Sequence, residues 1–137
     1  SLKELHLANS EAVRSVNTWL AEDLLVYLKE GVGSVNLVLN AQKVSIRNNY
    51  GWQTLRLSGN VAALFADLDG AASLQAPSLT VQDSIAFRST SPLSSWIRAG
   101  QLKLKAQLYG AGDLFYTGTP SVLLKTEYST GKVLAKQ

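Results

Sequence analysis

The chain contains the segment Asn17-Thr-Trp-Leu-Ala-Glu-Asp-Leu24, followed by Gly31-Val-Gly-Ser-Val-Asn-Leu37. The same order of residue types returns later as Ser94-Ser-Trp-Ile-Arg-Ala-Gly-Gln-Leu102, followed by Gly110-Ala-Gly-Asp-Leu-Phe-Tyr116. The tryptophans stand at positions 19 and 96 and the glycines at positions 33 and 112, so the two copies keep nearly the same offset. Because internal repeats are typical of stacked equivalent units, residues 17–46 and 94–125 predict a repeat architecture.

A shorter period runs through the same chain. Small or turn-forming residues recur at a nearly constant spacing in two ladders. The first ladder is Gly33, Gly51, Ala72, Pro92, Gly112 and Gly131, and the second is Ala41, Gly59, Ser78, Gly100 and Thr119. Two turn ladders of one period predict a β-solenoid with coils of about 20 residues.

The segments between these turns alternate apolar and polar residues, as strands with one buried face do. In Leu102-Lys-Leu-Lys105 the leucines fall on one face and the lysines on the other. We therefore expect inward and outward sets: Leu102, Leu104, Leu114, Val122 and Leu124 in the core, and Lys103 and Lys105 in solvent. We expect the three prolines to lie beside turns, because a proline inside a central strand removes a ladder hydrogen bond.

The N-terminal part allows two interpretations. Val13, Val16, Leu20, Leu24 and Tyr27 follow the three-or-four spacing that is typical of a helix, and Ser10 is a suitable cap. The repeat favours a strand for residues 24–29. For residues 8–22 a short capping helix remains an alternative. The domain prediction is one solenoid over residues 1–137, with a cap at about 1–20 and coils at about 21–137.

Composition limits the function classes. The chain has 137 residues, of which 46% are hydrophobic and 17% charged, as in a globular domain. It has no cysteine, which excludes disulfides and thiolate chemistry. The net charge of +3 is too small to indicate nucleic acid as a partner. No transmembrane segment is expected, and the start at Ser1 is expected to lie inside a longer precursor.

The C-terminal part carries the most characteristic motifs. They are Leu108-Tyr-Gly-Ala-Gly-Asp-Leu-Phe-Tyr-Thr-Gly-Thr-Pro-Ser-Val122 and Tyr128-Ser-Thr-Gly-Lys-Val133. From about residue 17 to 137 the chain resembles the head GIN domain family of auto-transporter adhesins. The resemblance implies an all-β fold, a right-handed single-stranded parallel β-helix. It also implies an exported bacterial protein of the periplasm, outer-membrane surface or extracellular space, with no established catalytic residues.

Candidate sites are few. Tyr109, Asp113 and Tyr116 form a candidate ligand surface, although capping of backbone N–H groups in its turn is the favoured interpretation for Asp113. The sequence Asp67-Leu-Asp69-Gly70 resembles the start of a calcium loop but lacks the further oxygen ligands, so a turn is expected. His6 is the only histidine, which excludes a two-histidine metal site. No metal, cofactor or phosphate-binding loop is expected.

Two function classes follow. The leading prediction is a non-enzymatic envelope or adhesion module whose partner is a cell-surface glycan or protein. The alternative is a polysaccharide-binding or polysaccharide-degrading β-helix protein, since fold alone does not decide function. Clustering of Asp67, Asp69, Asp83 and Asp113 beside Arg88 or Arg98 would favour the enzyme. Exposed aromatic residues suit sugar rings, whereas the two repeat tryptophans are expected to pack in equivalent places. Oligomeric state is left open.

Overall fold

A computed structural model describes residues 2–7, 13–14, 19–28, 32–48 and 52–135, and within them the regular structure consists of strands alone. The described residues contain no helix that is long and apolar enough to cross a membrane. The strands are β1 (Leu2–Leu7), β2 (Val13–Arg14), β3 (Trp19–Leu28), β4 (Val32–Asn48), β5 (Trp52–Leu68), β6 (Ala71–Ser89), β7 (Ser95–Gly100), β8 (Lys103–Leu108), β9 (Leu114–Gly118), β10 (Val122–Glu127) and β11 (Val133–Ala135).

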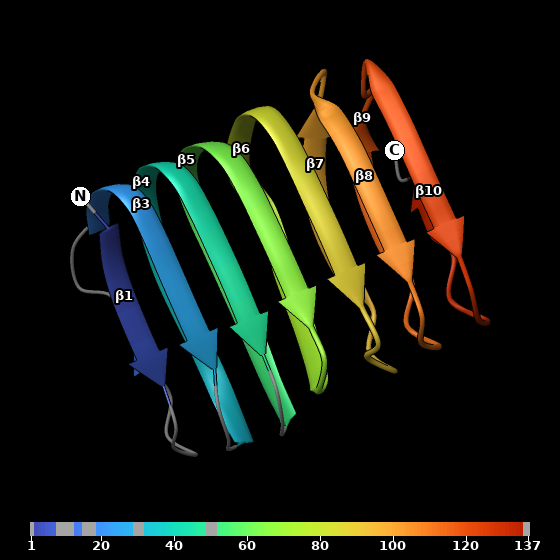
Figure 1. The fold of residues 1–137 in the computed structure, drawn as a ribbon, viewed down its shortest axis with the longest axis horizontal. Helices are drawn as coiled ribbons and strands as arrows, with labels where there is room; N and C mark the ends of the chain where they lie inside the picture. The colour runs from blue at the N-terminus through green and yellow to red at the C-terminus, as the bar shows by residue number, and fades with distance from the viewer. Residues whose placement is uncertain (1, 8–12, 15–18, 29–31, 49–51, 136–137) are drawn as a thin grey trace.

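All described strand pairs are parallel, and each coil lies on the coil before it. One column of paired residues shows the regular period, and its members are Leu24, Val44, Leu64, Ile85, Leu104 and Leu123. The front strands run downward and the rear strands upward as the chain advances, so the coils wind right-handed (Figure 1). The predicted parallel β-solenoid is thus confirmed, and its coil length agrees with the spacing of the turn ladders.

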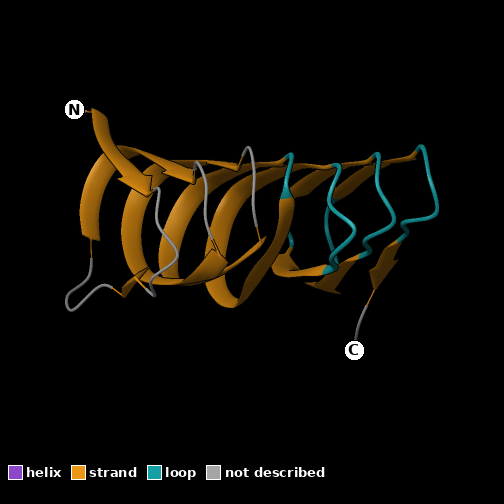
Figure 2. Ribbon diagram, turned by 90° about the horizontal axis from the view of Figure 1, so that it is seen from below, coloured by secondary structure: helices purple, strands orange, loops and turns teal. Residues whose placement is uncertain are grey.

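Each coil has two flat sides joined by a corner. In β4, β5 and β6 one long strand bends through the corner, whereas later coils divide into β7 and β8, then β9 and β10. The second halves of the long strands pair on one side with β3 and β8, and β1 and β10 extend that side at its two ends. Figure 2 shows the coils side by side along the solenoid axis.

The core lies inside the coils and consists of columns of leucine, isoleucine, valine and alanine. Leu102, Leu104 and Leu114 are buried, while Lys103 and Lys105 are exposed, as the alternation predicted. Burying one such side chain contributes roughly 1.5–3 kcal/mol, so stacking coils provides most of the stabilisation.

The prediction for β10 is wrong. Val122 and Leu124 pair with Lys103 and Lys105 and are exposed, Leu124 by 59%. Leu123 instead continues the inward column above Leu104. The strand is shifted by one residue relative to its apolar alternation, which moves the whole set to the other face.

The capping helix is also not present where the structure can test it. Residues 13–14 and 19–22 are strand, and β1 already pairs with β3, so parallel pairing begins at Leu2. Residues 8–12 and 15–18 lie outside the described part. Local helical spacing is overridden here because pairing onto β4 satisfies the backbone of both strands.

Two smaller expectations need correction. Trp19 pairs with Leu39. Trp96 pairs with Gln75 and belongs to a different column, the one that contains Asn36 and Arg56. The two tryptophans are therefore not equivalent. Pro77 lies within β6, not beside a turn. It sits where the register between β5 and β6 slips by one residue, and a bulge tolerates a residue that lacks an N–H donor.

Candidate functional site

A row of four residues marks the ends of successive strands on one edge of the solenoid. Each backbone N–H donates to a carbonyl of the preceding coil: Asp69 to Asn48, Thr90 to Leu68, Tyr109 to Ser89, and Tyr128 to Leu108, at 2.8–2.9 Å. We call Asp69, Thr90, Tyr109 and Tyr128 the terminal row. Its members repeat at about the strand spacing of 4.8 Å.

Two tyrosines end the terminal row. The rings of Tyr109 and Tyr128 are stacked, with centroids 4.5 Å apart and planes only 11° from parallel. They remain 38% and 62% exposed. Stacked aromatic pairs of this kind contribute about 0.5–1.5 kcal/mol beyond the area they bury. Both side chains are therefore ordered without being part of the core.

Arg88 lies next to this stack. Its guanidinium carbon is 5.1 Å from the centroid of the Tyr109 ring, within the range of a cation–π contact. The chain thus places Arg88, Tyr109 and Tyr128 in one continuous stack from three successive coils. Successive row members are one coil length apart in the sequence, and this is the signal by which the sequence could have indicated the row.

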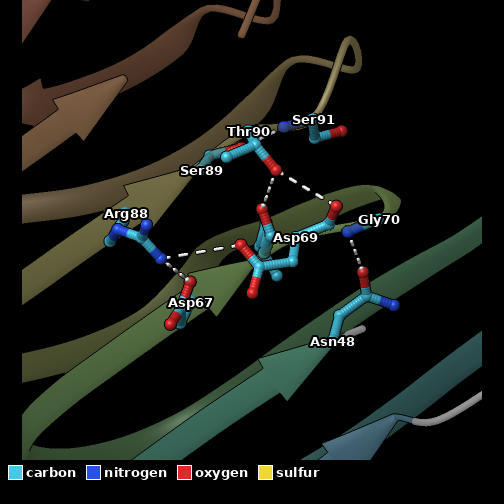
Figure 3. Close-up of polar contacts among 9 residues, drawn as sticks. Asn48, Asp67, Asp69, Gly70, Arg88, Ser89, Thr90 and Ser91 are labelled. Atoms are coloured by element: carbon cyan, nitrogen blue, oxygen red, sulfur yellow. Dashed lines mark hydrogen bonds and ion pairs between the residues drawn. The ribbon is translucent and has the colours of Figure 1, made fainter. Parts of the chain in front are cut away.

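Two carboxylates hold Arg88 in position (Figure 3). Its Nη1 atom donates to Asp67 Oδ1 at 3.0 Å and lies 3.5 Å from Asp69 Oδ1. The charge of Asp67 is the largest cause that raises the pKa of Arg88, with Asp69 adding to it. The guanidinium therefore stays protonated, and the site carries one fixed cation between two partly exposed anions.

The turn beneath the row is fixed by side-chain hydrogen bonds. Asn48 is buried, and its Oδ1 atom accepts from the backbone N–H of Gly70 at 2.7 Å. The Thr90 hydroxyl donates to the carbonyl of Asp69 at 3.1 Å (Figure 3). Asp69 and Gly70 form a turn between β5 and β6, as expected from the sequence. These contacts position the carboxylate of Asp69 relative to Arg88.

The three predicted ligand residues have different surroundings. Tyr109 belongs to the terminal row. Asp113 Oδ1 accepts from the backbone N–H of Lys132 at 2.8 Å, so it caps the next coil. Tyr116 is partly buried against the core. Only Tyr109 of the predicted set therefore remains at the candidate site, and sequence reasoning did not connect it with Arg88 and Asp67.

The acidic residues divide in the same way. Asp67 and Asp69 meet at Arg88, whereas Asp83 lies in β6 near its second register shift and Asp113 lies in the turn before β9. Arg98 is exposed on β7. Among the described residues no three histidine, aspartate or glutamate side chains are grouped closely enough to hold a metal ion.

A second aromatic pair lies on the other side of the solenoid. Trp96 and Phe115 contact each other with centroids 6.2 Å apart and planes tilted by 56°. Trp96 is 36% exposed, so it packs on the outer surface and not in the core. Leu134 pairs with Phe115 and extends this apolar strip onto β11.

A shallow depression lies on the outer surface of β3 and β4. Its volume is about 340 Å³, and Asp23, Lys43, Ser45 and Arg47 are among the residues that line it. Lys43 and Arg47 are both exposed and carry most of its charge. The terminal row offers ordered aromatic rings in addition to charge, so we regard the row as the stronger candidate site.

The fold and the surface define a parallel β-solenoid with an exposed aromatic and charged edge. A family model described as "putative auto-transporter adhesin, head GIN domain" matches residues 1–120. The chain belongs to this family, as its resemblance indicated. No curated protein and no solved structure matches it.

Proposed function

We propose that the protein is a non-enzymatic, exported adhesion module that binds a cell-surface glycan or protein through the terminal row. Its place would be the periplasm, the outer-membrane surface or the extracellular space. The observation that carries the proposal is the exposed Tyr109–Tyr128 stack ordered by Arg88. Membership of an adhesin family supports it.

The chemistry of the row suits a polyhydroxylated or mixed polar partner. It presents the carboxylate of Asp69, the hydroxyl of Thr90 and the phenol groups of Tyr109 and Tyr128, so each coil contributes one polar group. Aromatic side chains supply large contact area at low cost in conformational entropy. The cation of Arg88 is preorganised by Asp67, which reduces the ordering cost of binding.

The test is binding of the purified domain to glycan arrays and to isolated bacterial envelope material. Tyr109→Ala and Tyr128→Ala should each weaken binding about tenfold or more, which corresponds to about 1.4 kcal/mol. Lys105→Ala is the matched control, because Lys105 is exposed outside the row and should leave binding unchanged. Equal binding by all variants would show that the terminal row does not bind the partner.

The meeting of Asp67, Asp69 and Arg88 keeps the polysaccharide-active alternative testable. A glycosidase needs one carboxyl group that donates a proton and another that remains ionised. Here one oxygen of each carboxylate instead contacts the guanidinium of Arg88, so neither group is free to act on a sugar. We therefore expect no hydrolase or lyase turnover of polysaccharides. Turnover that disappears in Asp67→Asn would support the alternative function.

A further inference from the structure

The last complete coil exposes an unusual amount of apolar surface. Eight large hydrophobic side chains are exposed in the described residues, and five of them lie in residues 122–134. These five are Val122, Leu123, Leu124, Tyr128 and Leu134. Of the described strands, only β8 pairs with β10, so the other side of β10 is a sheet edge. Edges of this kind pair readily with another strand.

The inward-facing residues are apolar in β8 but include two charged residues in β10. Leu104, Ala106 and Leu108 of β8 are buried, and the residues paired with them are Leu123, Lys125 and Glu127. Another coil stacked in the same register would enclose Lys125 and Glu127, and burying charges in an apolar core is costly. The edge is therefore suited to a partner that pairs these charges.

A second copy of the chain can pair with this edge in a register that matches complementary residues. Let two β10 strands pair antiparallel about a two-fold axis, with Thr126 opposite Thr126 of the second copy. Lys125 then lies opposite Glu127 on the inner face, and Leu124 lies opposite Tyr128, the residue that follows β10, each pair occurring twice. Opposite-charge, threonine–threonine and aromatic–aliphatic cross-strand pairs are the stabilising combinations in antiparallel sheets.

The neighbouring registers are unfavourable. Centring the axis on Lys125 places lysine opposite lysine, and centring it on Glu127 places glutamate opposite glutamate. Like charges directly opposite each other destabilise a strand pair. A shift by one residue would place inner residues opposite outer ones, which the sheet alternation does not permit.

We propose that β10 is the contact edge of a two-fold dimer in which two solenoids meet at their C-terminal coils. The interface is isologous, so it closes at two copies and does not extend into a filament. It joins β10 to β10 and covers Tyr128, while Asp69, Thr90 and Tyr109 of the terminal row stay open. Dimerisation and the ligand binding proposed above therefore compete for Tyr128, but the dimer itself is tested without any ligand.

Sedimentation velocity over a range of concentrations tests the dimer. The full chain should shift from monomer to twice the monomer mass. Lys125→Glu should abolish the shift, because it places glutamate opposite glutamate. The double variant Lys125→Glu with Glu127→Lys should restore it, since the exchanged charges pair again about the same axis. Because Glu127→Lys also removes the acceptor of the Val133 N–H, its melting temperature is measured in parallel to show that the end of the solenoid is intact. A monomer at all concentrations, a ladder of larger oligomers, or failure of the double variant to recover would each overturn the proposal.

A cysteine test covers the case in which charge reversal disturbs folding. The chain has no cysteine of its own. Thr126→Cys should form a disulfide-linked dimer under mild oxidation, because opposite residues of an antiparallel pair lie within disulfide range. Lys105→Cys is the matched control on the same face, one strand away from the edge. Equal cross-linking of the two variants would indicate random collision and would overturn the two-fold register.

Discussion

At the scale of single residues, β8 shows how one alternation sorts side chains between core and solvent. Leu104 is buried between Ile85 and Leu123 in its column, whereas Lys105 faces outward. Leucine side chains stacked in this way lose their contacts on both sides when truncated, since the neighbouring coils cannot collapse into the gap.

We expect Leu104→Ala to lower the free energy of unfolding by about 2–5 kcal/mol. Lys105→Ala should stay within about 0.5 kcal/mol of the wild type, as surface substitutions usually do. Chemical denaturation of both variants measures the difference. If Lys105→Ala were the more destabilising variant, the register of β8 would have to be revised.

Gly59 is required by the corner of β5. Its φ angle is +111°, and a Cβ atom there would collide with the backbone carbonyl of Leu39 on the preceding coil. Gly100 also has a positive φ, +56°, but a Cβ atom there would meet nothing within 4 Å. Comparing substitutions at the two positions therefore distinguishes the cost of a positive φ angle from the added cost of a collision between coils.

Gly59→Ala should accordingly be more destabilising than Gly100→Ala. The conformational cost at Gly100 is about 1–2 kcal/mol, and Gly59 adds the collision with Leu39 to a comparable strain. Thermal and denaturant unfolding of the two variants checks the order. Equal losses would mean that the spacing of the coils can relax around residue 59.

At the scale of elements, β10 illustrates how turns set the phase of a strand. The N–H of Thr119 donates to the carbonyl of Gly100 at 2.7 Å, and that of Ser121 donates to Leu102 at 2.8 Å. These corner hydrogen bonds place Leu123, not Leu124, above Leu104. Because no further described strand covers β10, its two faces differ less in burial than those of inner strands.

We expect Leu124→Gln to change the free energy of unfolding by less than about 0.5 kcal/mol, since Leu124 is exposed. Leu102→Gln should cost several kcal/mol, because it buries an amide without a hydrogen-bond partner. Both are measured by denaturation at low protein concentration, where the proposed dimer is dissociated. A large loss of unfolding free energy for Leu124→Gln would instead support the register expected from the alternation, with Leu124 in the core.

At the scale of the whole molecule, the end of the solenoid protects the coil beneath it. Val133 is buried and pairs with Leu114, and its N–H donates to Glu127 Oε2 at 2.8 Å. Gly131 donates to the carbonyl of Gly110, and Lys132 donates to Asp113. The segment after β10 therefore satisfies the backbone of the preceding turn.

Deleting residues from Tyr128 onward should cause aggregation or loss of cooperative unfolding, because it uncovers Leu114 and Tyr116. Lys132→Ala is the control and should leave the melting temperature unchanged, because the side chain is exposed and the backbone N–H that bonds to Asp113 is kept. Light scattering and calorimetry distinguish the two outcomes. Tryptic cleavage at Lys125 or Lys132 that left a soluble domain with an unaltered melting temperature would contradict the expectation.

Much of this architecture can be predicted from local pattern. The coil period, the solenoid and the core positions of Leu102, Leu104 and Leu114 follow from turn spacing and alternation, whereas the parallel β-helix and the family follow from the resemblance carried by the C-terminal motifs. These features depend on residues a few positions apart and on a period that repeats along the chain. These predictions hold even though the two tryptophans of the repeat, which were expected to be equivalent, are not.

The candidate site depends instead on contacts between coils. Asp67, Arg88 and Tyr109 are about one coil apart in sequence, and they meet because the bulges in β6 adjust the register so that Asp67 pairs with Arg88. The orientation of β10 likewise depends on corner hydrogen bonds with the coil before it. Periodicity specifies that strands stack and roughly how often they recur. Only the folded chain decides which side chains share a column, because a shift of one residue reverses every face of a strand.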